Sequence, residues 1–505
     1  MSIIGIDLGT TNSLVAELDN TGRPRIVHNR EGSNLTPSVV HYQAGGKVTV
    51  GQEAKSLIGI EKDVFSEFKR EMGTSTTYLS SKGELTPTDL SALVLKRLKD
   101  DFESSVGKAT SAVVTVPANF RNEAREATLA AIRETGLSTD ILLNEPTAAA
   151  LYYANVSGLQ LNGYYVVFDL GGGTLDVSVI KATGNDVEVL ASEGLQALGG
   201  KDFDKKLFEI VSRKFKASTG NELNEFDFGF SKNDAEDVKK SLSNVKEKKI
   251  QLFGQGIKPT SIIVTRDEFE ESISGFMAQA EFLCENVLEL AALTPRDIKE
   301  IFLAGGSSRI PLVKTTMSKF FGRDALMTGN PDEVIALGAA IYAGFKADKK
   351  HLNPLQSQAV AGITFQEISP AYFGTLVRDD GKKAMGIAAI RNSIIIEKNV
   401  KIPCSKTETF YTVLDSQTSV ICSITQAPTP EVDPRFVRVI WEGSIELPPG
   451  RPAGQEVKIT YSYNENGTMH AEFLDVASSK KTEANIGAQR DAVQSTLDIN
   501  KFIVE

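Results

Sequence analysis

Up to about Ala347, short apolar runs alternate with amphipathic segments along the chain. In residues 90–106 ("LSALVLKRLKDDFESSV") and 125–137 ("REATLAAIRETGL"), apolar residues recur three or four positions apart, which is the spacing of a helix with one buried face. Strands that alternate with helices are typical of α/β domains. We therefore predict an α/β fold for this part of the chain.

From about Gly362 onward the helical spacing disappears. Strand-length apolar runs are separated by turn sequences such as "RDDGKK", "LDSQTS" and "NENGTM". In residues 457–476 apolar and polar residues alternate on both sides of Asn466-Gly467, a pair that suits a type I′ hairpin turn. This pattern predicts an all-β module.

The polar segment "ADKKHLNPLQSQ" lies between the two parts and indicates a linker. The predicted boundaries are residues 1–347 for the α/β domain, 348–362 for the linker, 363–488 for the β-rich domain and 489–505 for a short tail.

Composition narrows the classes of partner. The 505 residues are 41% apolar and 24% charged, and the net charge of −10 argues against a nucleic-acid or anionic-membrane partner. The longest apolar run, residues 334–345, is shorter than the roughly 18 residues that span a bilayer. The first residues show no secretory signal, and the three cysteines and four histidines are scattered without disulfide or zinc spacing. We therefore expect a cytoplasmic protein with no membrane partner.

Two glycine turns carry the first chemical signal. "IIGIDLGTTNSLVAEL" and "FDLGGGTLDVS" each place an aspartate, Asp7 or Asp169, before a Gly/Thr-rich turn between two apolar runs. Such a turn directs several backbone N–H groups into one concave spot that suits a phosphate. Carboxylates beside a phosphate suit Mg²⁺, so Asp7, Asp169 and Asp176 are candidate metal ligands. The two copies indicate an internal duplication.

A third glycine signal, "IFLAGGSSRIP" at residues 301–311, follows an apolar run and precedes a predicted helix, where a polar ligand can bind. No lysine follows the glycines as in a Walker loop, and the spacing of a dinucleotide fingerprint is absent.

Seven segments together carry a resemblance: "IDLGTTNS", "VTVPANF", "NEPTAAAL", "FDLGGGTLDVS", "LGGKDFD", "AGGSSRIP" and "NPDEVIALGAAI". In this order they resemble the 70-kDa heat-shock (DnaK-type) chaperone family. The resemblance implies a two-lobed, duplicated actin-like ATPase domain of α/β class, followed by an all-β sandwich domain that binds peptides. It also implies ATP/ADP and Mg²⁺ as ligands.

The resemblance assigns roles to individual residues. The implied catalytic residues are Lys69, Glu145, Asp169, Thr174 and Asp176. The implied nucleotide-binding residues are Asp7, Gly9, Thr10, Thr11, Asn12, Gly171, Gly172, Gly173, Thr174, Gly199, Gly200, Glu236, Lys239, Lys240, Ser243, Gly305, Gly306, Ser307, Arg309, Ile310 and Asp332. By residue type alone, Lys69 and the charges of "EDVKK" are typical of a solvated helix surface.

The same resemblance places a peptide cleft and a switch between the domains. The implied cleft residues are Thr375, Val377, Arg378, Phe410, Tyr411, Val413 and Val420, and the implied switch residues are Pro117 and Arg125. For each apolar cleft residue, packing in the domain core is an equally good interpretation.

The chain departs from the family pattern at several places. Lys201 replaces a glutamate near the nucleotide, and Arg378 replaces an apolar residue of the cleft, where a cation should disfavour basic peptides and admit acidic ones. The predicted linker lacks the family's run of leucines, so we expect weak coupling between the domains. The predicted tail is too short for the family's helical lid.

The leading hypothesis is an ATP-dependent molecular chaperone, a stress-response protein that assists protein folding by binding unfolded or extended peptides while it hydrolyses ATP slowly with Mg²⁺. The expected partners are such polypeptides, a J-domain co-chaperone and a nucleotide-exchange factor. One alternative is a nucleotide-binding interaction or regulatory protein with little hydrolysis. A small-molecule kinase of the same superfold is less favoured, because the β-rich module and the chaperone-like segments have no role in it.

Overall fold

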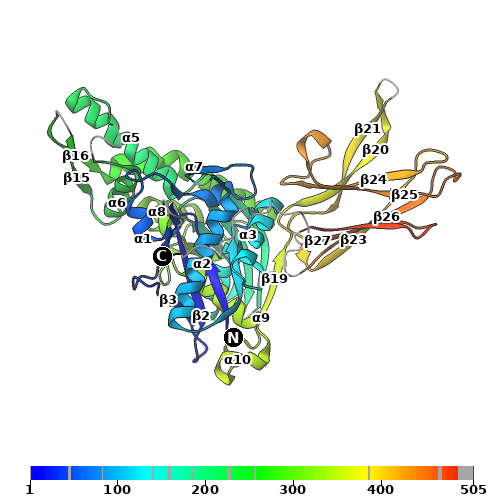
Figure 1. Cartoon of the computed structure of the whole chain (residues 1–505), viewed down its shortest axis with the longest axis horizontal. Helices are drawn as coiled ribbons and strands as arrows, with labels where there is room; N and C mark the ends of the chain where they lie inside the picture. The colour runs from blue at the N-terminus through cyan, green and yellow to red at the C-terminus, as the bar shows by residue number, and fades with distance from the viewer. Residues whose placement is uncertain are drawn as a thin grey trace.

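The computed structural model describes residues 2–43, 47–81, 83–138, 141–156, 161–184, 186–223, 229–254, 257–384, 387–464, 469–486 and 504. The predicted turn at Asn466-Gly467 and the predicted tail, apart from Val504, lie outside these residues. Figure 1 shows a larger part built of helices and sheets, with a β-rich part beside it. The predicted mixed α/β class is confirmed.

The first large sheet has the strand order β11-β10-β1-β2-β3, and β4 pairs with β2. β1 runs antiparallel to β2 and parallel to β10, and β10 runs parallel to β11. The strands are β1 (Ser2–Asp7), β2 (Asn12–Leu18), β3 (Pro24–Val27), β4 (Thr36–Pro37), β10 (Ala109–Val116) and β11 (Leu142–Asn144). We call this sheet and the elements around it the first lobe.

The second large sheet repeats that arrangement. Its order is β18-β17-β12-β13-β14-β19-β22, in which β12 runs antiparallel to β13 and parallel to β17, and β17 runs parallel to β18. The five strands from β18 to β14 therefore match the first sheet strand for strand, as the duplicated glycine turns predict. The strands are β12 (Asn162–Leu170), β13 (Leu175–Thr183), β14 (Asp186–Leu195), β17 (Ile298–Ala304), β18 (Ala325–Leu326), β19 (Thr364–Ile368) and β22 (Lys401–Ile402). This sheet and its surroundings form the second lobe.

Two helices lie between the large sheets. α9 (Val334–Lys346) packs on β1 and β2, whereas α4 (Glu145–Val156) packs on β12 and β13. They cross at Gly338, where an added Cβ atom would lie 1.7 Å from the carbonyl oxygen of Ala148. Only glycine permits this approach, which holds the two lobes together.

Further elements complete the lobes. In the first lobe these are β5 (Val39–Tyr42), β6 (Val48–Val50), α1 (Gln52–Ser56), β7 (Val64–Ser66), η1 (Phe68–Glu71), β8 (Tyr78–Ser80), β9 (Gly83–Leu85), α2 (Pro87–Ser105) and α3 (Asn122–Glu134). In the second lobe they are α5 (Gly200–Thr219), α6 (Lys232–Leu242), β15 (Glu247–Gly254), β16 (Ile257–Thr265), α7 (Arg266–Leu290), η2 (Gly306–Arg309) and α8 (Pro311–Phe321).

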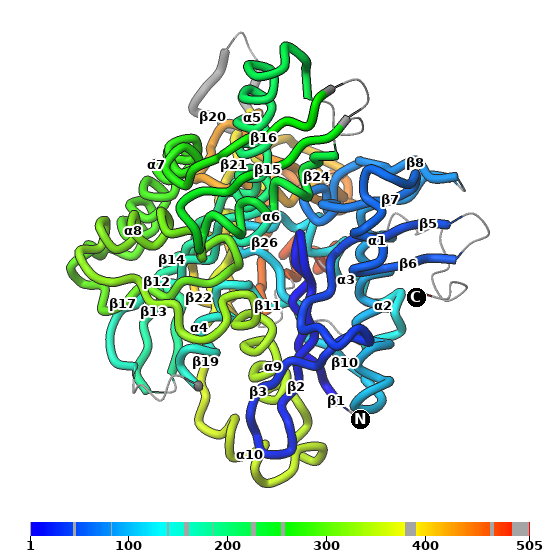
Figure 2. The backbone as a smooth tube through the Cα atoms, turned by 90° about the vertical axis from the view of Figure 1, so that its left-hand side faces the viewer, coloured from blue at the N-terminus to red at the C-terminus, as the bar shows by residue number. Residues whose placement is uncertain are grey.

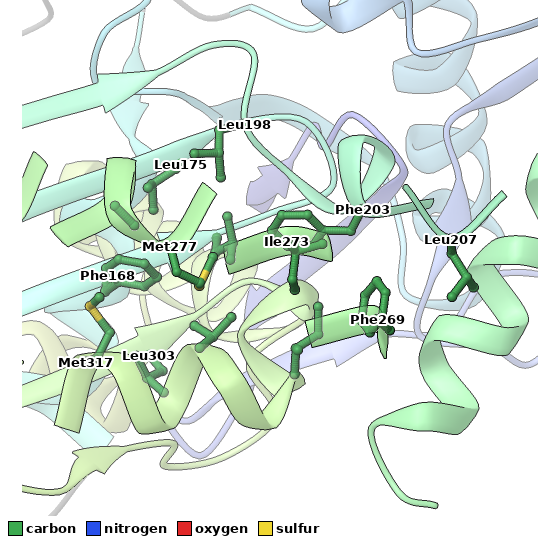
Figure 3. Packing of buried hydrophobic residues seen from close by; sticks show 14 of the residues in the cluster. Phe168, Leu175, Leu198, Phe203, Leu207, Phe269, Ile273, Met277, Leu303 and Met317 are labelled. Carbon is green, nitrogen blue, oxygen red and sulfur yellow. The ribbon is translucent and has the colours of Figure 1, made fainter. Parts of the chain in front are cut away.

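The core of the second lobe lies directly behind the second glycine turn. Phe168, the residue before Asp169, is completely buried in a cluster with Met277, Leu303 and Met317 from α7, β17 and α8 (Figure 3). A large apolar side chain at this position fixes the end of β12. The turn that follows is therefore attached to a rigid support.

The β-rich part is a sandwich of two sheets with one core. Within the described residues the sheet orders are β21-β20-β24-β25 and β23-β26-β27-β28. The elements are β20 (Tyr372–Ala384), β21 (Ile387–Ile396), β23 (Cys404–Tyr411), β24 (Ser419–Ala427), η4 (Pro434–Phe436), β25 (Arg438–Glu446), β26 (Glu456–Tyr463), β27 (Met469–Asp475) and β28 (Lys481–Ile486).

The segment predicted as a polar linker is largely helical. It contains η3 (Lys349–His351) and α10 (Pro354–Val360), which begins with Asn353 as N-cap. The Nδ2 atom of Asn353 donates to Asn20 O at 3.0 Å, and Gln356 Nε2 donates to Leu18 O at 2.8 Å. α10 therefore lies against the β2–β3 hairpin of the first lobe (Figure 2).

β19 corrects the predicted boundary at residue 363. It runs parallel to β14, so it belongs to the sheet of the second lobe. Ile363 and Ile368 are buried in the core that contains α4 and α9, and the ring of Phe365 lies edge-on to Tyr342 at 6.1 Å. The physical reason is that Ile363, Phe365 and Ile368 supply apolar side chains that pack in this core.

The sandwich contacts both lobes beyond β19. Lys398, which follows β21, has its Nζ 2.6 Å from Glu193 Oε1 on β14. Arg438 Nε lies 3.1 Å from Glu123 Oε1 on α3. Among the described residues, no helix is long and apolar enough to cross a membrane.

Candidate functional site

The two glycine turns face each other between the lobes. The first connects β1 to β2, and the second connects β12 to β13. A Cβ atom added to Gly172 would lie 1.9 Å from Thr11 Oγ1, and one added to Gly173 would lie 2.6 Å from Thr10 Oγ1. A larger residue at Gly172 or Gly173 would collide with the first turn. The glycines therefore bring two sets of backbone N–H groups to one place.

A cavity of about 550 Å³ opens at these turns. That volume lies in the range of small-molecule sites. Of the residues assigned to catalysis and nucleotide binding, the lining includes Asp7, Gly9, Thr10, Thr11, Asn12, Lys69, Glu145, Asp169, Gly171, Gly172, Gly173, Thr174, Gly200, Glu236, Lys239, Lys240, Ser243, Gly305, Gly306, Ser307, Arg309, Ile310 and Asp332. Segments far apart in the sequence thus meet in one chamber.

Gly199 and Asp176 do not line this cavity. An added Cβ atom at Gly199 would lie 2.6 Å from the backbone nitrogen of Gly173, so Gly199 lies behind the second turn. Asp176 is completely buried, and its Oδ1 accepts a hydrogen bond of 3.1 Å from the backbone N–H of Ala118. Both residues support the turn rather than forming the cavity wall.

Lys69 and Glu145 form a buried ion pair on the cavity wall. Lys69 Nζ lies 2.6 Å from Glu145 Oε1, and the two side chains are 6% and 7% exposed. The ammonium also lies 5.7 Å from the ring centre of Phe120. Lys69 has a residue type that is typical of the surface, but here it is buried and paired at the site.

Three buried aspartates surround the turns. Burial, then the charge of Glu145, raises the pKa of Asp7 to about 7 and that of Asp176 to about 8, and it raises the pKa of Asp169 well above its usual value. Thr115 Oγ1 donates to Asp7 Oδ1 at 3.1 Å. Ionisation of these aspartates is therefore unfavourable, and a bound cation would favour it.

Buried oxygen atoms at the site lack partners. Within the described part of the chain, Thr11 Oγ1, Asp169 Oδ1 and Asp176 Oδ2 make no hydrogen bond. Such atoms are costly unless a ligand or ion satisfies them. The described residues contain no group of three or more Asp, Glu, His or Cys side chains that could hold a metal ion directly. The arrangement fits Mg²⁺, which keeps several of its own waters and takes few direct protein ligands.

At the other end of the cavity, lysines surround Glu236. Its carboxylate lies 2.8 Å from Lys240 Nζ and 3.1 Å from Lys55 Nζ, and it lies 3.8 Å from Lys201 Nζ. Burial opposes its ionisation, but these charges outweigh burial and lower the pKa of Glu236. Lys239 pairs with Asp204 at 2.7 Å. This end therefore presents a fixed carboxylate among cationic groups.

A model of the Hsp70 protein family matches residues 3–79 and 74–505. The chain belongs to the Hsp70 family. Members of this family are ATPases and chaperones that bind ATP or ADP, unfolded polypeptides and co-chaperones.

Sequence reasoning missed several residues that the Hsp70 fold brings to the cavity. Asp204, which pairs with Lys239, belongs to the segment "LGGKDFD". Thr115, which donates a hydrogen bond to Asp7, belongs to the segment "VTVPANF". Leu14, Leu35, Met327 and Ile335 add apolar surface that no local motif marks. Lys201, noted as a departure from the Hsp70 pattern, lines the cavity and lies 3.9 Å from Glu67 of the first lobe.

Arg125 and Pro117 lie near the connection to the sandwich. Arg125 is buried and donates to Phe120 O at 3.1 Å, Ala118 O at 3.3 Å and Asn144 Oδ1 at 2.5 Å. It also lines a small cavity with Glu367 of β19 and Tyr463 of the sandwich. Pro117 directly follows β10. Arg125 thus lies where the first lobe meets both other parts.

The residues assigned to the peptide cleft divide into two groups. Thr375 is buried, and Phe410 and Val420 pack against the sandwich core. Tyr411, Val413 and Arg378 are exposed, and Val377 is half-buried. Only part of the predicted cleft set is therefore accessible to a peptide.

β20 and β24 are paired only at one end. Their register covers Tyr372–Gly374 opposite Thr425–Ala427, and two positions beyond Gly374 the N–H of Leu376 donates to Ser423 Oγ at 2.9 Å. A side-chain hydroxyl thus replaces a backbone partner where the two strands separate.

Proposed function

We propose that this Hsp70 protein hydrolyses ATP with Mg²⁺ and couples this to binding of extended polypeptide segments. One observation carries the proposal: two aspartate-headed glycine turns meet beside the buried Lys69–Glu145 pair. Phosphoryl transfer depends mostly on positioning and charge neutralisation, and these groups are arranged for both.

Each group has a proposed role in ATP hydrolysis. The N–H groups of the two turns and Thr174 bind the phosphates, and Lys69 orients the terminal phosphate and the attacking water. Glu145 fixes Lys69. Asp169 lines the cavity, one of its carboxylate oxygens makes no hydrogen bond within the described residues, and its pKa is raised, so it is suited to accept the proton of that water.

Mg²⁺, when bound, would neutralise phosphate charge near Asp7, Asp169 and Asp176. Glu236, Lys239, Lys240 and Ser243 would contact the adenosine together with Arg309 and Ile310 of the η2 region.

The sandwich would bind peptide at the exposed members of the cleft set. Where β20 and β24 separate, strand edges are available to an extended segment, which is a common mode of peptide recognition. We also propose a J-domain co-chaperone, a nucleotide-exchange factor and a cytoplasmic location.

The deciding experiment measures ATP turnover with Mg²⁺, without Mg²⁺, and with an unfolded apolar peptide. Slow, Mg²⁺-dependent release of phosphate that rises with peptide supports the proposal. Nucleotide binding without phosphate release would favour the interaction protein, and a phosphorylated sugar would favour the kinase.

A further inference from the structure

Arg70, the residue after Lys69, reaches from the first lobe to the second. Its Nη2 donates to the carbonyl oxygen of Gly173 at 3.0 Å and lies 2.7 Å from Asp202 Oδ2. The side chain is 20% exposed. A Cβ atom added to Gly173 would lie 2.9 Å from Arg70 Nε, so the guanidinium lies directly against the second glycine turn.

Lys69 and Arg70 point to different parts of the molecule. Both belong to η1, where successive side chains diverge by about 120° because a 3₁₀-helix has three residues per turn. Lys69 is bound to Glu145, whereas Arg70 is bound to Gly173 and Asp202. This one short helix therefore fixes the position of Lys69 relative to the second turn.

The bond to Gly173 also orients a backbone N–H group. In a trans peptide the carbonyl and the following N–H point in opposite directions. Gly173 and Thr174 line the cavity, but Arg70 does not. A carbonyl held outward by Arg70 turns the N–H of Thr174 towards the cavity.

Asp202 strengthens this link. Its Oδ2 also accepts the backbone N–H of Gly199 at 2.9 Å at the start of α5. Arg70 thus binds the turn and the beginning of the helix that supports it. One nitrogen of the guanidinium, Nη2, serves both acceptors, and the planar group holds it in a fixed geometry that a flexible ammonium lacks.

We propose that Arg70 is a positioning residue for ATP hydrolysis, which places the N–H of Thr174 and the ammonium of Lys69 around the same phosphate when the lobes are closed. The proposal rests on the proposed ATPase activity. It adds a residue that lies outside the cavity lining.

The test compares the parent protein with Arg70→Ala and Arg70→Lys, and with Arg25→Ala as a control. Arg25 pairs with Glu17 at 2.6 Å within the first lobe, so its removal also breaks an arginine–carboxylate pair but does not affect the contact between lobes. We expect single-turnover hydrolysis to fall about 10- to 100-fold in Arg70→Ala, with ATP affinity within threefold of the parent, because preorganised donors act on the transition state. Arg70→Lys should recover part of the rate.

A second measurement does not depend on hydrolysis. Hydrogen exchange at residues 171–175, with and without a non-hydrolysable ATP analogue, should show protection in the parent and in Arg25→Ala that Arg70→Ala lacks. Parental protection in Arg70→Ala would overturn the proposal even if the parent hydrolyses no ATP. An equal loss of rate and affinity would also overturn it, because it would indicate general binding. A parent that shows the expected protection pattern but no turnover would refute only the proposed ATPase activity.

Discussion

Asp169 and Asp176 lie directly opposite each other across the β12–β13 hairpin, and both are almost completely buried. Like charges in this arrangement destabilise a sheet. Each carboxylate also keeps one oxygen atom without a hydrogen bond in the described part of the chain. The folded protein therefore stores an electrostatic cost that a proton or a cation can relieve.

The first prediction concerns stability as a function of pH without divalent cations. The pKa of Asp176 is raised to about 8 in the folded state, so between about pH 4 and pH 8 the folded protein holds a proton that the unfolded chain has lost. The free energy of unfolding should therefore fall as the pH rises from 6 to 8.5. Asp176→Asn should reduce this fall by about 1 kcal/mol or more, since one pKa unit corresponds to about 1.4 kcal/mol.

Urea unfolding at pH 6 and pH 8.5 measures this effect. Asp237→Asn is the matched control, because Asp237 is exposed on α6. Equal pH dependence in the parent and in Asp176→Asn would show that Asp176 does not hold the extra proton.

The second prediction concerns Lys69. Lys69→Ala should lower single-turnover hydrolysis by a factor of about 100 or more and leave ATP affinity nearly unchanged, because orientation of the terminal phosphate is a transition-state role. The variant leaves Glu145 buried without its partner, which should cost about 3 to 5 kcal/mol of stability.

The double variant Lys69→Ala/Glu145→Gln separates the two effects. It should regain thermal stability but not activity. Hydrolysis at the parental rate in a folded Lys69 variant would refute the role of Lys69.

The glycine turns could be predicted from the sequence because their signal is local. An aspartate, a Gly/Thr-rich turn and flanking apolar runs fix a hairpin within a few residues, and the structure brings both copies to one cavity. The repeated turn also indicated an internal duplication, and the two large sheets share one strand order over five strands.

β19 and Arg70 could not be found this way because their partners are distant. The sequence "TFQEI" resembles a half-polar edge strand, and its partner β14 lies more than 160 residues earlier. Arg70 has the residue type of a solvated surface, and its bonds to Gly173 and Asp202 exist only when the two lobes meet. Pairing between residues that are far apart in the sequence leaves no periodic pattern of apolar residues around either partner.

The third prediction concerns coupling through β19. Because Ile363 and Ile368 are buried beside β14, the reason for expecting weak coupling no longer holds. Burial of an Ile side chain contributes about 1.5 to 3 kcal/mol, which is as large as a typical coupling free energy of 1 to 3 kcal/mol. Ile363→Asp should therefore detach the strand and abolish the stimulation of ATP hydrolysis by peptide.

Leu355→Asp is the control, since Leu355 is an exposed residue of α10. Limited proteolysis of residues 356–368 with ATP should be slow in the parent and in this control and fast in Ile363→Asp. Equal cleavage in all three proteins would mean that β19 does not hold the domains together.

The last prediction concerns which peptides the sandwich prefers. Arg378 is exposed on β20 opposite Ile390, whose side chain is also exposed, so a cation and an apolar group lie together at this edge. An exposed charge pair contributes about 0.2 to 1 kcal/mol, so an acidic extended peptide should bind up to about fivefold more tightly than its basic counterpart. The preference should weaken at high salt because the charges are exposed to solvent.

Arg378→Leu should remove the preference while keeping affinity for a neutral apolar peptide. The control is Arg435→Ala, which changes an exposed arginine of η4 that is paired with Asp433, and it should leave the preference intact. Fluorescence anisotropy with the three labelled peptides distinguishes the cases, and an unchanged preference in Arg378→Leu would place peptide binding elsewhere on the sandwich.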